Sequence, residues 1–374
     1  MRPVPAALIF AVGLAAVLPA RAHVVYGGTT LRQLTLESDL VVRARIVDPA
    51  AELWLEEPLL REAVVSAEVL EILDGTREAE ELRFVQHGHG VPLYEKGDEV
   101  LLFLQRIERS RELAASGVAS RIRFVSVQEA GEQFALDAAT RDAFTAAVRA
   151  YAALEQLPAE ARLDALRRIT VELLASREPE LAGSALRDLV LARDLPLLTR
   201  EDLPALEPLL MRAATPIGVR IGLVAELERR GLLAGPPRWA ELVRTTSGAD
   251  RLAAVRAAGA HPSEAVAKEL TPLLASEDPL LVAAAAVALG APGSEAAVAP
   301  LAVLLGSPEP RVRAAAIRGL GKVATTGARE ALAKAAASHP DASTRRRAGA
   351  EVKLLDRSAA SGTKVEADVK GDAR

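Results

Sequence analysis

The chain has 374 residues, of which half are apolar and only 3% aromatic, and its net charge is −4. This length suits about two or three domains, and a core built mainly from Ala, Leu and Val favours close-packed helices. The charge gives no general attraction to nucleic acid or to an anionic membrane surface. The lack of cysteine excludes disulfides, thiolate metal sites, cysteine nucleophiles and lipid attachment through cysteine.

Residues 1–22 have the pattern of an export signal. The basic start MRPVP precedes an apolar run over residues 6–18, and Ala20-Arg21-Ala22 supplies an A-x-A cleavage site. The run is short for a membrane span, and an uncleaved anchor is the alternative. We expect an exported protein, periplasmic or extracellular, that begins at His23 and has no membrane span after cleavage.

Residues 29 to about 136 alternate between apolar and polar side chains as β-strands do. In DLVVRARIVD one face is apolar and the other basic: Leu40, Val42, Ala44 and Ile46 alternate with Arg43 and Arg45. Further strands are predicted in LREAVVSAEVLEIL, EELRFVQHG, KGDEVLLFLQRI, RIRFVSVQ and EQFALD. Five or six short strands with turns between them predict a small all-β barrel or sandwich.

The segments ESDLVVRARIV, VVSAEVLEILDG, YEKGDEVLLFL and VQEAGEQFAL resemble a domain found at the start of many exported bacterial proteins. That domain is similar to the oligonucleotide/oligosaccharide-binding (OB) barrel in netrin-like domains of metalloproteinase inhibitors. The resemblance implies an OB-like barrel over residues 23–136. Those inhibitors ligate the target's metal through an N-terminal cysteine, which this chain lacks, so protease inhibition is kept only as an alternative function.

Residues 137–355 form predicted helices with a fixed period at their C-terminal end. KELTPLLASEDPLLVAAAAVALG returns one period later as APLAVLLGSPEPRVRAAAIRGLG, so Leu270 corresponds to Leu301 and Gly290 to Gly321. A further copy follows with a small insertion, and a weaker one ends at Gly259. A unit of two helices cannot bury its apolar face alone, so the period predicts an all-α solenoid that is most regular over residues 247–355.

The stretch DPLLVAAAAVALG is apolar after its first residue, but it has a proline at its start and Gly290 at its end, as a soluble helix does. Together with SPEPRVRAAAIRGLG, the repeats resemble HEAT repeats, especially the short class known from bilin lyases. The resemblance implies stacked helix pairs and a curved surface for protein partners, with second helices on the concave side. It does not imply lyase chemistry.

One helical face is a candidate binding surface. Arg311, Arg318 and Lys322 are spaced i, i+7 and i+11 and lie opposite an apolar face that includes Leu320. One repeat earlier, equivalent positions hold Leu280 and Val287. We therefore predict that a protein partner, acidic and with an apolar anchor, binds Leu280, Val287, Arg311, Arg318 and Lys322. A solvated face with ordinary salt bridges is the alternative, and Arg313 is expected to be a structural contact between repeats.

Histidines are the remaining candidates for chemistry. His23, His87 and His89 suit a metal site only if they converge, and a polar loop and a mobile N-terminus explain them more simply. His261 and His339 are expected to be solvated. Because no catalytic triad, phosphate loop or metal motif is present, no catalytic residue, metal or cofactor is predicted.

The sequence thus predicts a non-enzymatic, exported scaffold for protein–protein interaction. A protease inhibitor and a metal-dependent enzyme are the alternatives, and export and negative charge argue against nucleic acid as the partner. Residues 356–374 are small, charged and aperiodic, which predicts a disordered tail.

Overall fold

The computed structural model describes residues 29–57, 60–76, 80–86, 93–107, 124–127 and 134–371. The chain divides into two compact units, Tyr26–Leu232 and the residues from Leu233 onward, which are called here the N-terminal and C-terminal units. The last strand of the barrel ends at Ala135 and the next helix begins at Arg141, so the N-terminal unit contains both a barrel and helices.

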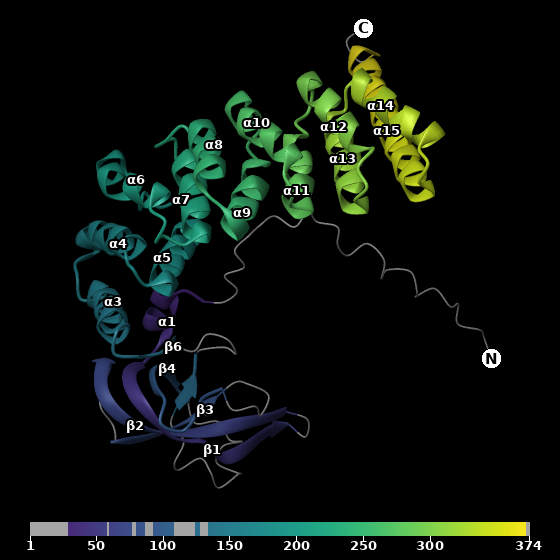
Figure 1. The fold of residues 1–374 in the computed structure, drawn as a ribbon. Helices are drawn as coiled ribbons and strands as arrows, with labels where there is room; N and C mark the ends of the chain where they lie inside the picture. Colours follow the sequence, from purple (N-terminus) through teal and green to yellow (C-terminus); the bar gives the residue numbers. More distant parts are fainter. Residues whose placement is uncertain are drawn as a thin grey trace, which may run out of the picture. The chain divides into compact units, whose positions relative to one another are not determined.

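The strands of the N-terminal unit form a closed barrel (Figure 1). They are β1 (Leu40–Glu57), β2 (Leu60–Asp74), β3 (Glu81–Gln86), β4 (Glu99–Arg106), β5 (Phe124–Ser126) and β6 (Phe134–Ala135). Their order is β1-β2-β3-β5-β4, β4 pairs again with β1, and β6 is added at β4. The β3–β5 pair is parallel and the other pairs are antiparallel. The predicted barrel is confirmed.

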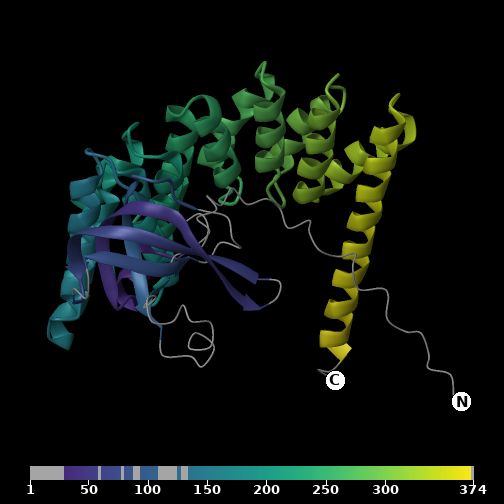
Figure 2. The same cartoon turned by 90° about the horizontal axis from the view of Figure 1, so that it is seen from below.

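Alternation along β1 places apolar side chains inside the barrel. Leu40, Val42, Ala44 and Ile46 belong to one buried cluster with residues of β2, β3, β4 and β5. Beyond residue 45, where its pairing with β4 ends, β1 continues to pair with β2 as far as Glu57. Figure 2 shows these two strands extending together from the barrel.

The arginine on the outer face of β1 connects the barrel to a helix. Arg43 forms ion pairs with Glu71 of β2 at 3.0 Å and with Glu99 of β4 at 2.7 Å. Arg141 of α3 (Arg141–Leu154) also pairs with Glu99, and Arg149 pairs with Glu71. Burial alone would raise the pKa of Glu99, but the hydrogen bond from Arg43 and the charge of Arg141 outweigh it and lower this pKa. The barrel and α3 are thus joined by charges that no local pattern predicts.

A short helix not predicted from the sequence, α1 (Leu31–Glu37), packs against β4, α3 and α5 (Pro179–Leu191). It begins with a capping box between Thr30 and Gln33. Its first amide, on Leu31, donates to Ser184 Oγ at 2.8 Å, and Arg32 pairs with the buried Asp188 at 3.2 Å. Burial raises the pKa of Asp188, and hydrogen bonds from Thr30 and Arg32 offset only part of this rise.

The other helices of the N-terminal unit are α4 (Ala159–Leu174), η1 (Arg200–Asp202), α6 (Leu203–Met211) and α7 (Ile217–Arg229). Helix α5 packs against α4 and α7, and α6 packs against α7. These contacts make an irregular helical stack beside the barrel, without the fixed period of the C-terminal unit.

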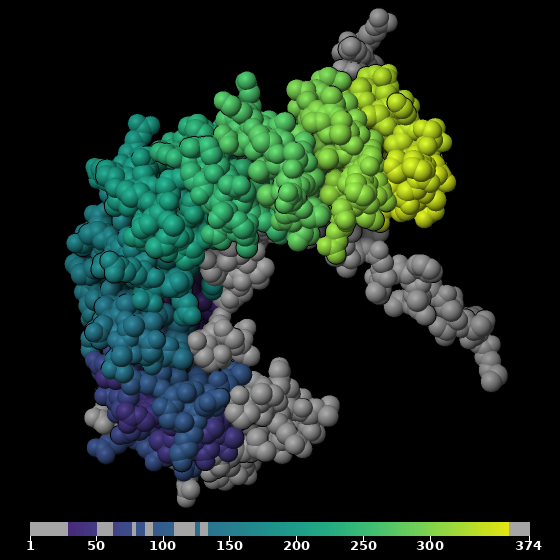
Figure 3. All heavy atoms as spheres, viewed as in Figure 1, coloured from purple at the N-terminus to yellow at the C-terminus, as the bar shows by residue number. Residues whose placement is uncertain are grey.

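The C-terminal unit is a stack of helix pairs. Its elements are α8 (Gly235–Thr245), α9 (Gly248–Ala258), α10 (Glu264–Leu270), η2 (Thr271–Ala275), α11 (Pro279–Leu289), η3 (Glu295–Ala297), α12 (Val298–Leu304), α13 (Pro310–Val323), α14 (Thr326–Ser338) and α15 (Ala342–Gly371). The second helices of the pairs, α9, α11, α13 and α15, contact one another in that order. Figure 1 shows them as one row beside the row of first helices, and Figure 3 shows their side chains packed closely. Helix α15 continues into residues 356–371, for which the sequence predicts disorder.

Candidate interaction surface

Glycines let neighbouring second helices approach one another closely. Leu289 and Leu320 occupy equivalent buried positions near the ends of α11 and α13, and Gly290 ends α11. A Cβ atom on Gly290 would lie only 2.5 Å from the carbonyl oxygen of Gly319, and one on Gly259 only 2.8 Å from Cα of Ala288. A side chain at either position would force these backbones apart, so glycine at 259 and 290 reflects contact between second helices, whereas a Cβ at the equivalent Gly321 would meet the side chain of Glu351.

Each of two second helices carries a structural arginine followed by one that has no partner among the described residues. Arg313 Nη1 donates to the carbonyl oxygens of Ser307 and Pro308 at 2.9 and 2.8 Å, and its Nε donates to Thr344 of the next repeat. This confirms Arg313 as a contact between repeats. Arg251 of α9 donates in the same way to the carbonyl of Thr246 at 2.6 Å.

Helix α11 departs from this pattern at two positions. The segments RLAAVR of α9 and RAAAIR of α13, one repeat to either side, correspond to VAAAAV in α11. Val282 therefore replaces the structural arginine and is buried, with 5% of its surface exposed. Val287 replaces the second arginine and is half-buried.

The structure places the predicted site residues on two neighbouring helices. Leu280 of α11 is 45% exposed, while Arg311, Arg318 and Lys322 of α13 are exposed. The apolar side of α13 is buried as predicted, with residues Val312, Ala316, Leu320 and Val323 each at 3% exposure or less.

The structure brings Lys322 and Val287 together. Lys322 Nζ donates to the carbonyl oxygen of Val287 at 3.1 Å, near the C-terminal end of α11. A cation there is favoured by the helix dipole. Although the side chain as a whole is exposed, burial of its ammonium group lowers the pKa of Lys322. This contact could not be read from sequence spacing, because it depends on how α13 packs on α11.

The sequence reading missed Arg256. It lies on α9 at the position equivalent to Val287 and Arg318, and it is exposed. Within the described part of the chain, Arg256, Arg311 and Arg318 have neither an ion pair nor a side-chain hydrogen bond, whereas Arg238 and Arg329 pair with carboxylates. Aligning the α9 repeat with the α11 repeat in the sequence would have placed Arg256 opposite Val287 and so identified it.

The helices that carry Leu280, Arg311 and Arg318 have no acidic residues of their own, although the carboxylate of Glu351 on α15 lies beside Gly321 of α13. Helices α11 and α13 contain no Asp or Glu within their bounds. Arginines without counter-charges beside an exposed leucine can form ion pairs and apolar contacts with a bound molecule. They offer no general base or nucleophile.

Comparison with known families identifies these repeats. Residues 236–307 and 300–353 match the family model of HEAT repeats. The C-terminal unit is built from HEAT repeats. A search of curated proteins gives no match.

Several solved structures resemble the chain at low identity. An engineered protein from a structural genomics consortium is 20% identical, over 51% of this chain and 96% of its own, with a TM-score of 0.33. A designed armadillo repeat protein is 19% identical over 54% of this chain and 96% of its own, with a TM-score of 0.31. Human deoxyhypusine hydroxylase, in complex with glycerol, is 18% identical over 57% of this chain and 85% of its own, with a TM-score of 0.29. Similarity at this level assigns no function.

The histidines of the HEAT repeats have structural partners, so the expectation that they are solvated is wrong. The ring of His261 stacks on buried Trp239, with centroids 4.3 Å apart. His339 Nε2 donates to the carbonyl oxygen of Leu305 at 2.9 Å, and its Nδ1 accepts from the amide of Asp341 at 3.0 Å. Sequence position places both residues in turns, but Trp239 belongs to α8 and Leu305 to the end of α12, so these two contacts depend on how the helices pack.

The predicted metal candidates cannot be placed. His23, His87 and His89 lie outside the described residues. Among the residues that are described, no group of three or more His, Asp or Glu is suited to hold a metal ion. The same residues include no helix long and apolar enough to cross a membrane.

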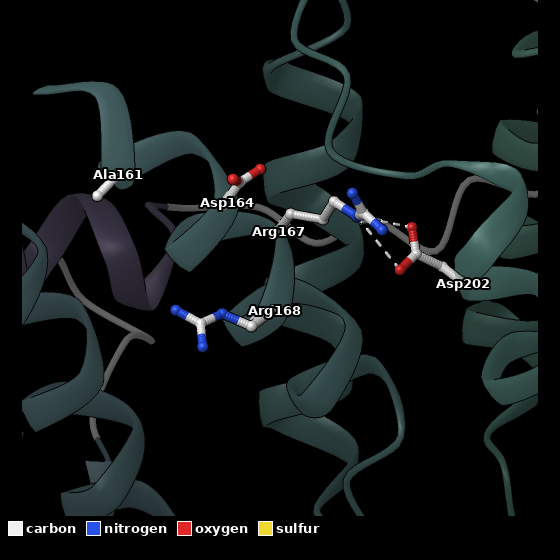
Figure 4. A pocket seen from close by; sticks show the side chains of 5 residues that line it. All are labelled: Ala161, Asp164, Arg167, Arg168 and Asp202. Carbon is white, nitrogen blue, oxygen red and sulfur yellow. Dashed lines mark hydrogen bonds and ion pairs between the residues drawn. The ribbon is translucent and has the colours of Figure 1, made fainter.

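A surface hollow of about 480 Å³ lies beside α4 in the N-terminal unit (Figure 4). It is lined by Ala161, Asp164, Arg167, Arg168 and Asp202. Arg167 pairs with Asp202 and Glu201, each at 3.0 Å. Because carboxylates already neutralise this guanidinium, Arg167 is explained by an ion pair between α4 and η1. Arg168, which also lines the hollow, has no ion pair or side-chain hydrogen bond with a described residue, so unpaired arginines are not confined to the HEAT repeats.

Proposed function

We propose that this protein is an exported scaffold that binds a protein partner through the second-helix face of its HEAT repeats and has no chemistry of its own. The observation that carries the proposal is the combination of exposed Leu280 on α11 with Arg311 and Arg318 on α13, which have no partner in the part of the chain that the structure describes. Protein interfaces are enriched in arginine and apolar contacts, and repeat proteins present such residues along a continuous surface. HEAT-repeat proteins generally bind protein partners, which supports the same function.

The test compares two triple variants of the full-length protein with equal charge change. Arg311, Arg318 and Lys322 are replaced by alanine in one variant, and Lys268, Lys334 and Lys353, exposed lysines of the same unit, in the other. Envelope proteins cross-linked to each variant are quantified at low and high salt. The face variant should lose the partner and the control should keep it. Equal yields from the two variants would show that this face is only solvated surface.

Export is the second part of the proposal. It rests on the basic start, apolar run and Ala20-Arg21-Ala22 site, all of which lie outside the described residues. N-terminal sequencing of the protein from the envelope fraction should find His23 first, and recovery of Met1 would contradict cleavage.

We further propose a netrin-like origin for the barrel domain, residues 23–136, and the short bilin-lyase class for repeats within 137–355. The strand order β1-β2-β3-β5-β4 with closure to β1 supports the first, and the short, fixed period of the C-terminal repeats supports the second. The OB-like strand order also keeps inhibition of an exported protease as the alternative function. Assay of the purified protein against a panel of envelope proteases tests that alternative.

A further inference from the structure

One position of the HEAT repeat recurs on three successive second helices with alternating chemistry. It holds Arg256 on α9, Val287 on α11 and Arg318 on α13, at equal spacing along the chain. Helix α11 contacts both α9 and α13. Since packed helices lie about 8–10 Å apart, the two arginines are separated by roughly 16–20 Å across the row.

The two arginines lack counter-ions. Neither Arg256 nor Arg318 pairs with any described residue, although most other arginines of the unit bond to carboxylates or carbonyls. An exposed arginine that is only solvated contributes little to stability, but it forms a strong bidentate ion pair with a carboxylate of a bound molecule.

The helix between them is apolar. Helix α11 has the sequence PLLVAAAAVAL, and its surface includes Leu280 and Val287. A nucleic acid backbone would favour a continuous row of cations, whereas the side chains of α11 are all apolar. The ammonium group of Lys322 lies near Val287, but it belongs to α13 and donates to the carbonyl oxygen of Val287. A polypeptide with an apolar side chain between acidic ones matches the order basic, apolar, basic.

We propose that this face, if it is the partner site proposed above, binds an acidic polypeptide segment in an acid–apolar–acid arrangement. Carboxylates of the segment pair with Arg256 at one end and Arg318 at the other, and an apolar side chain between them contacts Val287. The carboxylates are separated by about 5–6 residues in an extended segment or about 11–13 residues in a helical one.

The experiment selects displayed random peptides of about 16 residues, long enough to reach across the row as a helix, on the immobilised full-length protein. Enriched peptides should carry Asp or Glu on both sides of an apolar residue. Arg256→Glu and Arg318→Glu should each weaken a selected synthetic peptide by about tenfold or more. Lys268→Glu, the same charge change on a first helix, should leave the affinity unchanged. The Arg256→Glu/Arg318→Glu double variant should instead select peptides with Lys or Arg at the flanks.

The outcomes separate this inference from the function on which it rests. Peptides that depend on Arg318 but not on Arg256, and that lack paired acidic flanks, overturn the inference and leave the partner site standing. Peptides whose affinity is unchanged by Arg256→Glu and by Arg318→Glu overturn both the inference and the proposed partner site. A single-stranded oligonucleotide that binds with the same dependence on both arginines, while no peptide is enriched, identifies a nucleic-acid site and also overturns the inference.

Discussion

Replacing Gly290 with alanine should force α11 and α13 apart and destabilise the HEAT repeats. The added Cβ would lie 2.5 Å from the carbonyl oxygen and 2.8 Å from Cα of Gly319. Close carbon–oxygen contacts in proteins are about 3.3–3.6 Å, so one backbone must move by nearly 1 Å. No rotamer change relieves the overlap, because the atoms met belong to the main chain.

The size of the effect follows from two opposing terms. Overpacking that shifts the backbone costs up to about 3 kcal/mol, whereas the reduced flexibility of the unfolded chain returns at most about 1 kcal/mol. The difference between these terms leads us to expect that Gly290→Ala lowers the free energy of unfolding by about 2 kcal/mol.

Urea unfolding of the full-length protein measures this change. Trp239 is 1% exposed within α8 and reports on the HEAT repeats, and a Trp54→Phe background makes it the only tryptophan. Gly349→Ala is the matched control, because its Cβ would lie 3.7 Å from Cβ of Ala336, an ordinary contact, within helix α15. The control should be stabilised by up to about 1 kcal/mol. If Gly290→Ala is as stable as Gly349→Ala, the second helices do not approach as closely as described.

Three further changes test the packing and the charges. Leu320→Asp should lower the unfolding free energy by several kcal/mol because it buries an unpaired carboxylate. Arg318→Ala should change the same free energy by less than about 1 kcal/mol. Urea midpoints in the opposite order would show that the buried and exposed sides of α13 are assigned wrongly. Hydrogen bonds from Thr344 lower the pKa of Asp341 to about 2, so its stabilisation is present above the unfolded pKa of 3.8 and lost as pH falls from about 4 to about 2. Asp341→Asn should remove that part of the pH dependence of the melting temperature, and an unchanged profile would contradict it. Limited proteolysis should leave the barrel joined to α3–α7, because ion pairs of Glu99 cross the strand–helix boundary; release of the barrel alone, seen by mass spectrometry, would argue against this link.

Local patterns predicted the barrel strands and the HEAT repeats, because burial in those elements follows a fixed period. The apolar positions of β1 and the buried side of α13 are spaced as their strand and helix require. Helix α1 was missed because it is only seven residues long and lies among strand signals. Its ordering depends on a hydrogen bond from Leu31 to Ser184, 153 residues further along the chain, which no local window contains.

The candidate site was predictable only in part for the same reason. Helical spacing correctly placed Arg311 and Arg318 on the exposed side of α13. It could not show that Lys322 reaches the end of α11, or that His339 bonds to a neighbouring repeat. Arg256 required an alignment of repeats rather than a pattern within one helix, since the α9 repeat is a weaker copy.

The two valines of α11, Val282 and Val287, differ in burial, so a substitution at Val287 can separate an effect on partner binding from an effect on stability. Val282 is buried where α9 and α13 use an arginine to bond loop carbonyls, so that position concerns packing. Val287 is half-buried where the other helices present unpaired arginines. Val287→Arg restores the repeat pattern, and it should change the unfolding free energy by less than about 1 kcal/mol because an exposed arginine side chain is accommodated at this position on both neighbouring helices.

The Val287→Arg substitution should change the binding of oligonucleotides and peptides even though it leaves the unfolding free energy nearly unchanged. An arginine at 287 adds a third guanidinium between Arg256 and Arg318, beside the ammonium group of Lys322 at the carbonyl of residue 287, so an oligonucleotide should bind more tightly and with a steeper salt dependence than to the wild type. A selected peptide with an apolar centre should bind more weakly, because its apolar side chain would meet a guanidinium in place of Val287. Urea unfolding and fluorescence titrations at two salt concentrations measure both effects. A loss of stability above about 2 kcal/mol would mean that Val287 serves packing between repeats, since only buried side chains of this size contribute so much.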